Sequence, residues 1–349
     1  MDKTKRRQSI MEHIQKDDII IRKGILHILD SHTGYLGLSS QLLEMGPDLM
    51  EFVRGHIFKI MESDDAKRCQ FNGSVSPVLS LLESMEESDD ESFIEATRVL
   101  GENLFDIMCD SVTIPAADLL CVTFQVQSVI HIALLKMNYK VTYVHREEED
   151  AEANIVKQRV MPTDSAKLTE AVIIDLTEYK VRLVEKKYEM LNGDKINYLS
   201  ERFLQCYADL APKKKFQILN KVINDINNHY PEDGIAKRLD MKSRLREEFT
   251  ENQAFKVNEI GDKLFGNHQG KKQEFDEKIE RYDMQYDTFT VAKENTVKKL
   301  EYQMLETDTG IEIKIPMEEY NTKDNVEIIE EPGGGSTIII KNIENVKIK

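Results

Sequence analysis

The spacing of apolar residues changes partway along this chain, and that change limits the folds open to it. Up to about residue 190, apolar residues gather in short runs rich in β-branched side chains, with two helical patterns among them. From about Asp194 to Leu305 they recur every three or four residues instead, as on one face of an α-helix. Together the patterns predict an α+β fold, with an antiparallel sheet first and a helical region after it.

The N-terminal region combines strand and helix signals. Ile19–Asp30 favours a strand, or a strand pair that pivots at Gly24. Pro47 suits the first position of a helix, and a second helix is expected from about Ser92. The remaining runs predict an antiparallel meander followed by two further strands, at Leu119–Val126, Val129–Met137, Lys140–His145, Ala171–Leu176 and Tyr179–Val184.

The helical region and the C-terminal stretch complete the predicted organisation. One amphipathic helix face is expected from Tyr198 to Tyr207, and Pro212 and Pro231 mark breaks between helices. After residue 306, Ile311, Ile313 and Ile315 alternate with charged residues as in a strand, and a Glu-Pro-Gly-Gly-Gly loop suits a hairpin between Val326–Ile329 and Ser336–Ile340. We therefore predict an α+β domain over 1–190, a helical region over 191–305 and a small β module over 306–349.

Charge is distributed unevenly along the chain. The formal net charge is −16, which opposes binding to a polyanion if it is spread evenly. Residues 211–300, however, hold 18 Lys plus Arg against 16 Asp plus Glu. The acidic runs Glu83–Glu91 and Glu147–Glu152 are read first as solvated loops; the alternative is that they occupy a basic partner site or mimic nucleic acid.

The helical region also holds the best candidates for phosphate contact. Arg238, Lys242 and Arg246 recur every four residues and so form one stripe along a helix. Such a stripe is a solvated face by default, but with a lysine cluster at a helix start it can position a protein on a nucleic-acid backbone. The predicted DNA contacts are Lys213, Lys214, Lys215, Arg238, Lys242, Arg246, Lys271 and Lys272.

Catalytic and metal-binding patterns are weak. Glu312 and Lys314 resemble the Glu-x-Lys element of metal-dependent nucleases, yet alternating charges are what any half-exposed strand shows. Asp175 and Glu178 are read as a turn, and Gly333–Gly335 as a hairpin loop without the lysine of a phosphate loop. His27 and His131 lie among apolar residues, as core histidines do. No catalytic residue, metal ligand or cofactor site is predicted.

Cysteine spacing and hydropathy bear on the compartment. The four cysteines lie far apart without a CxxC pair, which argues against zinc and against a disulfide framework. Polar residues interrupt the longest apolar region, Leu119–Leu135, so neither a membrane span nor a signal peptide is expected. A reducing cytoplasm is the expected location.

Two stretches carry a family resemblance. Lys167–Phe203 and Asp308–Ile343, read together, resemble the bacterial nucleoid-associated protein family of the NdpA type. The match extends from about Ile25 to the end of the chain and consists of hydrophobic and turn patterns. The resemblance implies a cytoplasmic protein on the nucleoid that associates with DNA and with other proteins of chromosome maintenance, without enzymatic activity.

Three functions follow from these observations. The leading hypothesis is a non-enzymatic protein that contacts the phosphates of double-stranded DNA through the helical region, with little sequence preference and as a homodimer. The main alternative is a protein-interaction adaptor that docks on DNA-processing enzymes through its acidic N-terminal half. A metal-dependent nuclease is the third. Salt dependence of DNA binding separates the first two, because direct phosphate neutralisation weakens steeply as salt rises.

Overall fold

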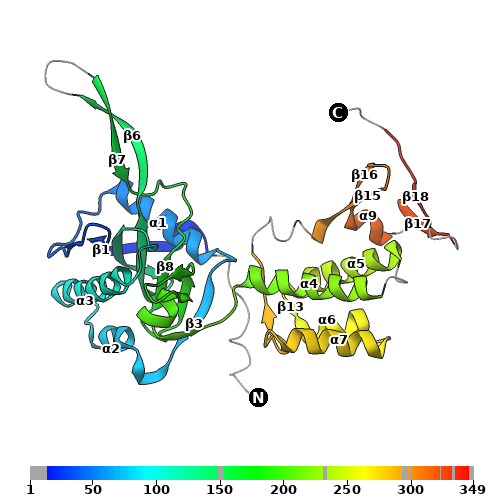
Figure 1. Cartoon of the computed structure of the whole chain (residues 1–349), viewed down its shortest axis with the longest axis horizontal. Coiled ribbons are helices and arrows are strands. Elements are labelled where there is room, and N and C mark those ends of the chain that lie inside the picture. Colours follow the sequence, from blue (N-terminus) through cyan, green and yellow to red (C-terminus); the bar gives the residue numbers. More distant parts are fainter. Residues whose placement is uncertain are drawn as a thin grey trace. The chain divides into compact units, whose positions relative to one another are not determined.

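An eight-stranded antiparallel sheet forms the first of two compact units, Met1–Asp209; the second is Leu210–Lys349 (Figure 1). The computed structural model describes residues 14–147, 153–230, 234–292, 298, 300–322, 324–331 and 335–345. The strand order is β12-β3-β9-β8-β5-β4-β1-β2. The strands are β1 Ile19–Asp30, β2 Tyr35–Gly37, β3 Lys67–Phe71, β4 Ala117–Val126, β5 Val129–Asn138, β8 Ala171–Asp175, β9 Val181–Val184 and β12 Cys206–Ala208.

Helices cover both faces of this sheet. Alternate residues of β4 point to opposite faces, so Leu119 and Cys121 pack with one cluster of apolar side chains and Leu120 and Val122 with another. Helices α2 (Pro77–Ser84) and α3 (Asp90–Cys109) contribute to the first cluster, and α1 (Pro47–Met61) to the second. Because both faces are covered, most residues of the central strands β4 and β5 are apolar.

The expected strands are present, but one of them pairs elsewhere. The first two runs of the predicted meander form the β4–β5 hairpin, with Val126 opposite Val129. The third does not continue the sheet, because β6 (Lys140–Glu147) pairs only with β7 (Ala153–Val160) in a separate two-stranded ribbon, while β5 pairs with β8. Ile19–Asp30 is one strand, with a register shift between Ile21 and Lys23.

Residues 191–209 belong to the sheet unit and not to the helices. The predicted amphipathic helix is limited to a short π-helical turn, Leu199–Phe203, after which β12 pairs with β3 at the sheet edge. Tyr198 and Leu204 are buried in the sheet-side core, whereas Tyr207 is 70% exposed. The unit boundary therefore falls at Asp209, while the sequence pattern placed it near residue 190. A short antiparallel strand pair, β10 (Tyr188–Glu189) with β11 (Lys195–Ile196), precedes this turn.

A buried polar cluster lies within the first unit. The Glu170 carboxylate accepts hydrogen bonds from Asn138 Nδ2 at 2.6 Å, Tyr188 Oη at 3.0 Å and Tyr198 Oη, and Lys136 Nζ lies 3.2 Å away. Lys136 and Glu170 are 2% and 0% exposed. Burial opposes ionisation of Glu170, but the Lys136 charge and these hydrogen bonds lower the pKa of its carboxyl. The charged pair is therefore part of the core.

Four helices form the centre of the second unit: α4 Pro212–His229, α5 Ile235–Asn252, α6 Val257–Phe265 and α7 Gln269–Glu280. Their core includes Phe216, Leu219, Leu245, Phe265 and Phe275, as the helical spacing predicts. A two-residue strand pair, β13 Phe255–Lys256 with β14 Thr288–Phe289, closes this core on one side.

The C-terminal elements pack on α5 in the same unit. They are the hairpin β15 Tyr302–Glu306 with β16 Glu312–Pro316, helix α9 Met317–Thr322, and the hairpin β17 Val326–Glu330 with β18 Ser336–Ile340. Leu239 of α5 packs with Ile315, Met317 and Val326. The strand predicted around Ile313 and the two strands predicted at 326–329 and 336–340 are thus all present, within two hairpins. Residues 332–334 of the predicted loop lie outside the described residues. Overall, the α+β fold class is confirmed.

Candidate nucleic-acid interface

One face of α4 is exposed and is rich in lysine and amide side chains, with the half-exposed carboxylate of Asp225 beside them. Pro212 occupies the first turn, where its missing N–H costs no hydrogen bond. One side of the helix buries apolar residues such as Leu219 and Ile226. The other side exposes residues at intervals of three or four, which therefore lie in one row. This row, called the α4 row below, consists of Lys214, Gln217, Lys221, Asn224 and Asn228.

A groove of about 870 Å³ lies beside the α4 row, between α4, α5 and β15. Its apolar lining includes Ile223, Met241, Leu245 and Leu305. Its cations are Lys221, Arg238 and Lys242, against the single carboxylate of Asp225. Asn227 is 5% exposed, and no partner is found for its Oδ1 among the described residues. The groove is thus amphipathic, with a positively charged rim.

Three of the five basic residues of α5, Arg238, Lys242 and Arg246, lie on one face of the helix, but they differ in exposure and in their partners. Arg238 is exposed and donates one hydrogen bond, from Nη2 to the Asn227 carbonyl oxygen at 3.2 Å. Lys242 Nζ donates to the Tyr302 carbonyl oxygen at 2.6 Å, and desolvation lowers its pKa. Arg246 Nη2 lies 3.9 Å from Glu318 Oε2. Of these three residues, Arg238 is the exposed one, whereas Lys242 and Arg246 are partly buried.

The lysine cluster at the start of α4 is divided between surface and core. Lys214 is exposed. Lys215 is only 8% exposed, and its Nζ lies 2.8 Å from Asp287 Oδ2. Lys213 is half-buried and has an interaction partner of its own. Because three consecutive residues of a helix point in three directions, 100° apart, they cannot share one surface. Lys215 therefore points into the protein toward Asp287, whereas Lys214 points to solvent.

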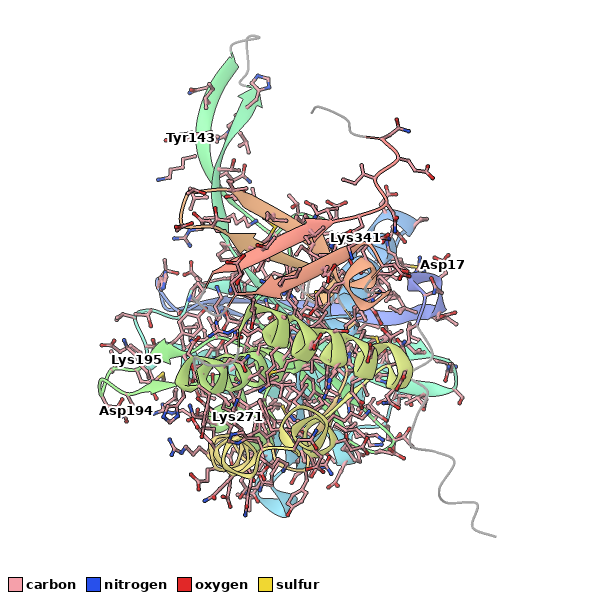
Figure 2. All side chains as sticks on the ribbon, turned by 90° about the vertical axis from the view of Figure 1, so that its right-hand side faces the viewer. Asp17, Tyr143, Asp194, Lys195, Lys271 and Lys341 are labelled. Carbon is pink, nitrogen blue, oxygen red and sulfur yellow. The ribbon has the colours of Figure 1, made fainter. Side chains whose placement is uncertain are left out.

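Lys271 and Lys272 also serve the packing of the helices. Lys271 is 3% exposed, and its Nζ lies 4.7 Å from the ring centroid of Tyr230; its place on α7 is labelled in Figure 2. Lys272 Nζ lies 3.2 Å from Asp262 Oδ1 and 2.6 Å from Asp276 Oδ2. A buried or doubly paired ammonium has little charge left for a phosphate. Lys271 and Lys272 would each have to leave these partners before they contacted a phosphate.

Sequence reasoning missed most of the α4 row. Gln217, Lys221, Asn224 and Asn228 are not adjacent in the sequence, so they do not stand out as a basic cluster. The signal was present, since the apolar positions of 212–229 define the exposed positions by subtraction.

The weaker chemical motifs have local roles. Lys314 Nζ lies 3.8 Å from the ring centroid of Tyr302, and Glu312, the first residue of β16, is exposed. Asp175 Oδ1 accepts hydrogen bonds from the backbone N–H of Thr177 and Glu178, which confirms the turn. Within the described ranges, no three His, Cys, Asp or Glu side chains gather where they could hold a metal ion.

The fold and this surface define a two-unit α+β protein with a basic, amide-rich helix face. The chain belongs to the nucleoid-associated protein YejK family (NA37), whose family model matches residues 25–347. The resemblance to bacterial nucleoid-associated proteins is thereby confirmed. A search of curated proteins found no match. None of the helices in the described part of the chain is both long and apolar enough to cross a bilayer.

Proposed function

We propose that this chain is a non-enzymatic nucleoid protein of the cytoplasm that binds double-stranded DNA through the α4 row and Arg238. The observation that carries the proposal is the α4 row itself, a line of two exposed lysines and three exposed amides with one half-exposed carboxylate, Asp225, beside it, in a chain that has 63 Asp plus Glu. A face of that kind favours a polyanion locally even though the net charge of −16 does not.

The chemistry of the row suits contact with a DNA backbone. Lys214 and Lys221 supply two ammonium groups two helical turns apart, roughly 10 Å along the axis. Gln217, Asn224 and Asn228 supply amide N–H donors, which hydrogen-bond phosphate oxygens without reading bases. Because these are backbone contacts, little sequence preference is expected.

The other basic residues of the groove have a supporting role in this proposal. Arg238 lies on the far side of the groove from the row and can reach a second phosphate. Lys213, Lys242 and Arg246 are partly buried, so each must leave an intramolecular partner before it contacts DNA. We expect them to add less affinity than the exposed residues.

Charge reversal on the row tests the proposal. A Lys214→Glu, Lys221→Glu chain should bind duplex at least tenfold more weakly, and the plot of log affinity against log salt should become less steep by about 2. The matched control is Lys186→Glu, Lys187→Glu, which makes the same charge change at two exposed lysines of the first unit. Fluorescence anisotropy over a salt series, with unrelated duplexes, measures both.

The outcomes separate the competing functions. Equal affinity of the row variant and the control would overturn the assignment of the row. An adaptor that docks on DNA-processing enzymes would show little binding of its own at any salt concentration. Duplex incubated with Mg²⁺ should remain intact; cleavage that a Glu312→Gln variant abolishes would identify a nuclease instead.

A further inference from the structure

Strand β15 borders the groove between α4, α5 and β15, and one of its edges is open. The strand pairs with β16 along its whole length and with no other described strand. The hairpin packs on α5 (Figure 1), and Gln303 and Leu305 of β15 line the groove. An open strand edge is a row of unpaired backbone N–H and C=O groups, which can accept a further strand.

Two side-chain contacts show which backbone groups belong to this edge. Lys242, which lines the groove, donates from Nζ to the carbonyl oxygen of Tyr302 at 2.6 Å. Gln303 Nε2 donates to the carbonyl oxygen of Met304 at 2.7 Å. Since the backbone groups of alternate residues point away from the partner strand, Tyr302, Met304 and Glu306 form the outward set. For the N–H groups of Met304 and Glu306, no acceptor outside the hairpin is found among the described residues. The edge therefore faces the groove and still has donors to offer.

The charge of the groove favours an acidic ligand. Lys221 and Arg238 are exposed and Lys242 is partly buried, so three cations line the groove. The one carboxylate of the lining, Asp225, lies 3.8 Å from Lys278 Nζ, a cation outside the lining, which offsets its charge. Because the rest of the lining is largely apolar or amide, a ligand that carries both carboxylates and apolar side chains is complementary to it.

The groove also holds an acceptor that lacks a donor. Asn227 lines it and is 5% exposed, and no partner is found for its Oδ1 among the described residues. A DNA backbone supplies only acceptor atoms here, whereas a peptide backbone supplies an N–H at every residue except proline. A peptide therefore matches both this acceptor and the open strand edge.

We propose that the groove binds an extended acidic peptide of a partner protein, which adds to the open edge of β15 as a third strand. Side chains of an added strand alternate between its two faces. Apolar residues at every second position then meet the lining, and the acidic residues between them reach Lys221 and Arg238. The five residues of β15 allow an added strand of roughly 17 Å. The Gln303 side chain leaves the Met304 carbonyl oxygen when the peptide binds.

Peptide and duplex share part of this surface, so they should compete. Lys221 and Arg238 belong to both sites. Lys214, in contrast, belongs to the α4 row and does not line the groove, and the outward N–H of Met304 belongs to the strand edge alone. Substitutions at Lys214 and at Met304 therefore separate the two ligands. Peptide binding does not require that the row binds DNA.

Fluorescence anisotropy with the full chain tests the proposal. The probe is a fluorescein-labelled peptide that alternates leucine and aspartate. Met304→Pro removes the outward N–H, so it should weaken binding at least tenfold. Met304→Ala keeps that N–H and should bind as the parent chain does. A leucine and lysine peptide of equal length should bind at least tenfold more weakly than the acidic one. Circular dichroism and melting temperature of both variants should match the parent chain.

A second probe leaves the protein unchanged. The acidic peptide with N-methyl groups on alternate backbone nitrogens cannot complete a strand ladder, and it should bind at least tenfold more weakly. The proposal is overturned if the parent chain does not bind the acidic peptide, if the two Met304 variants bind it alike, or if N-methylation or the exchange of aspartate for lysine has no effect.

The same variants distinguish other occupants of the edge. Self-association in sedimentation velocity that Met304→Pro abolishes, without peptide binding, would assign the edge to a second copy of the chain. Loss of duplex affinity in Met304→Pro but not in Met304→Ala would assign it to DNA. Lys214→Glu should weaken duplex binding and leave peptide binding unchanged, so its failure to affect DNA bears only on the α4 row.

Discussion

Lysine side chains have different roles in the two units. The role depends on whether other elements cover one side or both sides of the helix or strand that carries the lysine. Lys136 lies on β5, a strand covered on both faces, so its ammonium has to find a carboxylate in the core and pairs with Glu170. Lys214 and Lys221 lie on α4, which packs on one side only and leaves them in water. The comparison teaches that a basic residue is available to a ligand only when the element that carries it has an exposed face.

The energetic difference between the two settings is large. A buried pair that loses one partner leaves an uncompensated charge in a medium of low polarity, whereas an exposed lysine can be replaced at almost no cost to stability. Substitutions of the two kinds should therefore separate stability from DNA binding.

The largest effect is expected at Lys136. Lys136→Met removes the cation and leaves Glu170 buried beside three hydrogen-bond donors, which should lower the free energy of unfolding by about 3 to 5 kcal/mol. Urea unfolding followed by circular dichroism measures the change. Lys186→Met, at an exposed position, should change stability by less than about 0.5 kcal/mol. Similar losses in both variants would erase the contrast between the units.

A smaller effect is expected where the C-terminal module meets α5. Ile315 is 2% exposed and packs with Leu239, so Ile315→Ala should cost about 2 to 4 kcal/mol through lost burial and a cavity. Ile311, two residues earlier and 59% exposed, supplies the control. The melting temperature of each variant tests this. If Ile311→Ala and Ile315→Ala melt together, the module is not part of the folded body.

The smallest effect, counted per histidine and per pH unit, concerns the acid stability of the sheet unit. Burial lowers the pKa of His27 and of His56 from 6.5 to about 4, because it disfavours the charged ring, with nearby Arg98 and Lys59 adding to the effect. In the unfolded chain these two histidines bind protons below about pH 6.5, whereas in the folded chain they bind them only near pH 4. Stability should therefore fall as pH drops through this window, by up to about 1.4 kcal/mol per pH unit for each histidine.

Urea midpoints between pH 7 and pH 4.5 measure this dependence. Replacing both residues, as His27→Gln with His56→Gln, should flatten it. An exposed-histidine control is His145→Gln, which should leave the slope as it was. An unchanged slope in the double variant would assign the acid sensitivity to carboxylates.

Local pattern was enough to predict most elements of the fold. The β-branched runs of β4 and β5 and the helical spacing of α4 and α5 agree with the structure because their side-chain periods differ. Residues 191–209 were misread because β12 is three residues long and its pairing with β3 is a contact between distant parts of the sequence. Short edge strands carry too little periodicity to be told from a helix.

The candidate site was predictable only in part, for a related reason. The exposed side of α4 follows from its apolar side, so the α4 row was within reach of the sequence. The burial of Lys215 and Lys271 could not be predicted from the sequence, because their partners Asp287 and Tyr230 are 72 and 41 residues away along the chain. Tertiary packing decides which of these lysines stay exposed to solvent.

The position of β12 has a consequence for the order in which the chain can fold. Cys69 on β3 pairs with Ala208 on β12, so one edge of the sheet stays open until residue 208 has been synthesised. At about 5 to 20 residues per second, that delay lasts on the order of 10 s. During it, β3 has an unpaired edge, which is the kind of template that recruits other nascent chains. We therefore expect a chaperone that binds nascent chains, or a change in translation rate, to affect aggregation of this protein most before the second unit is synthesised.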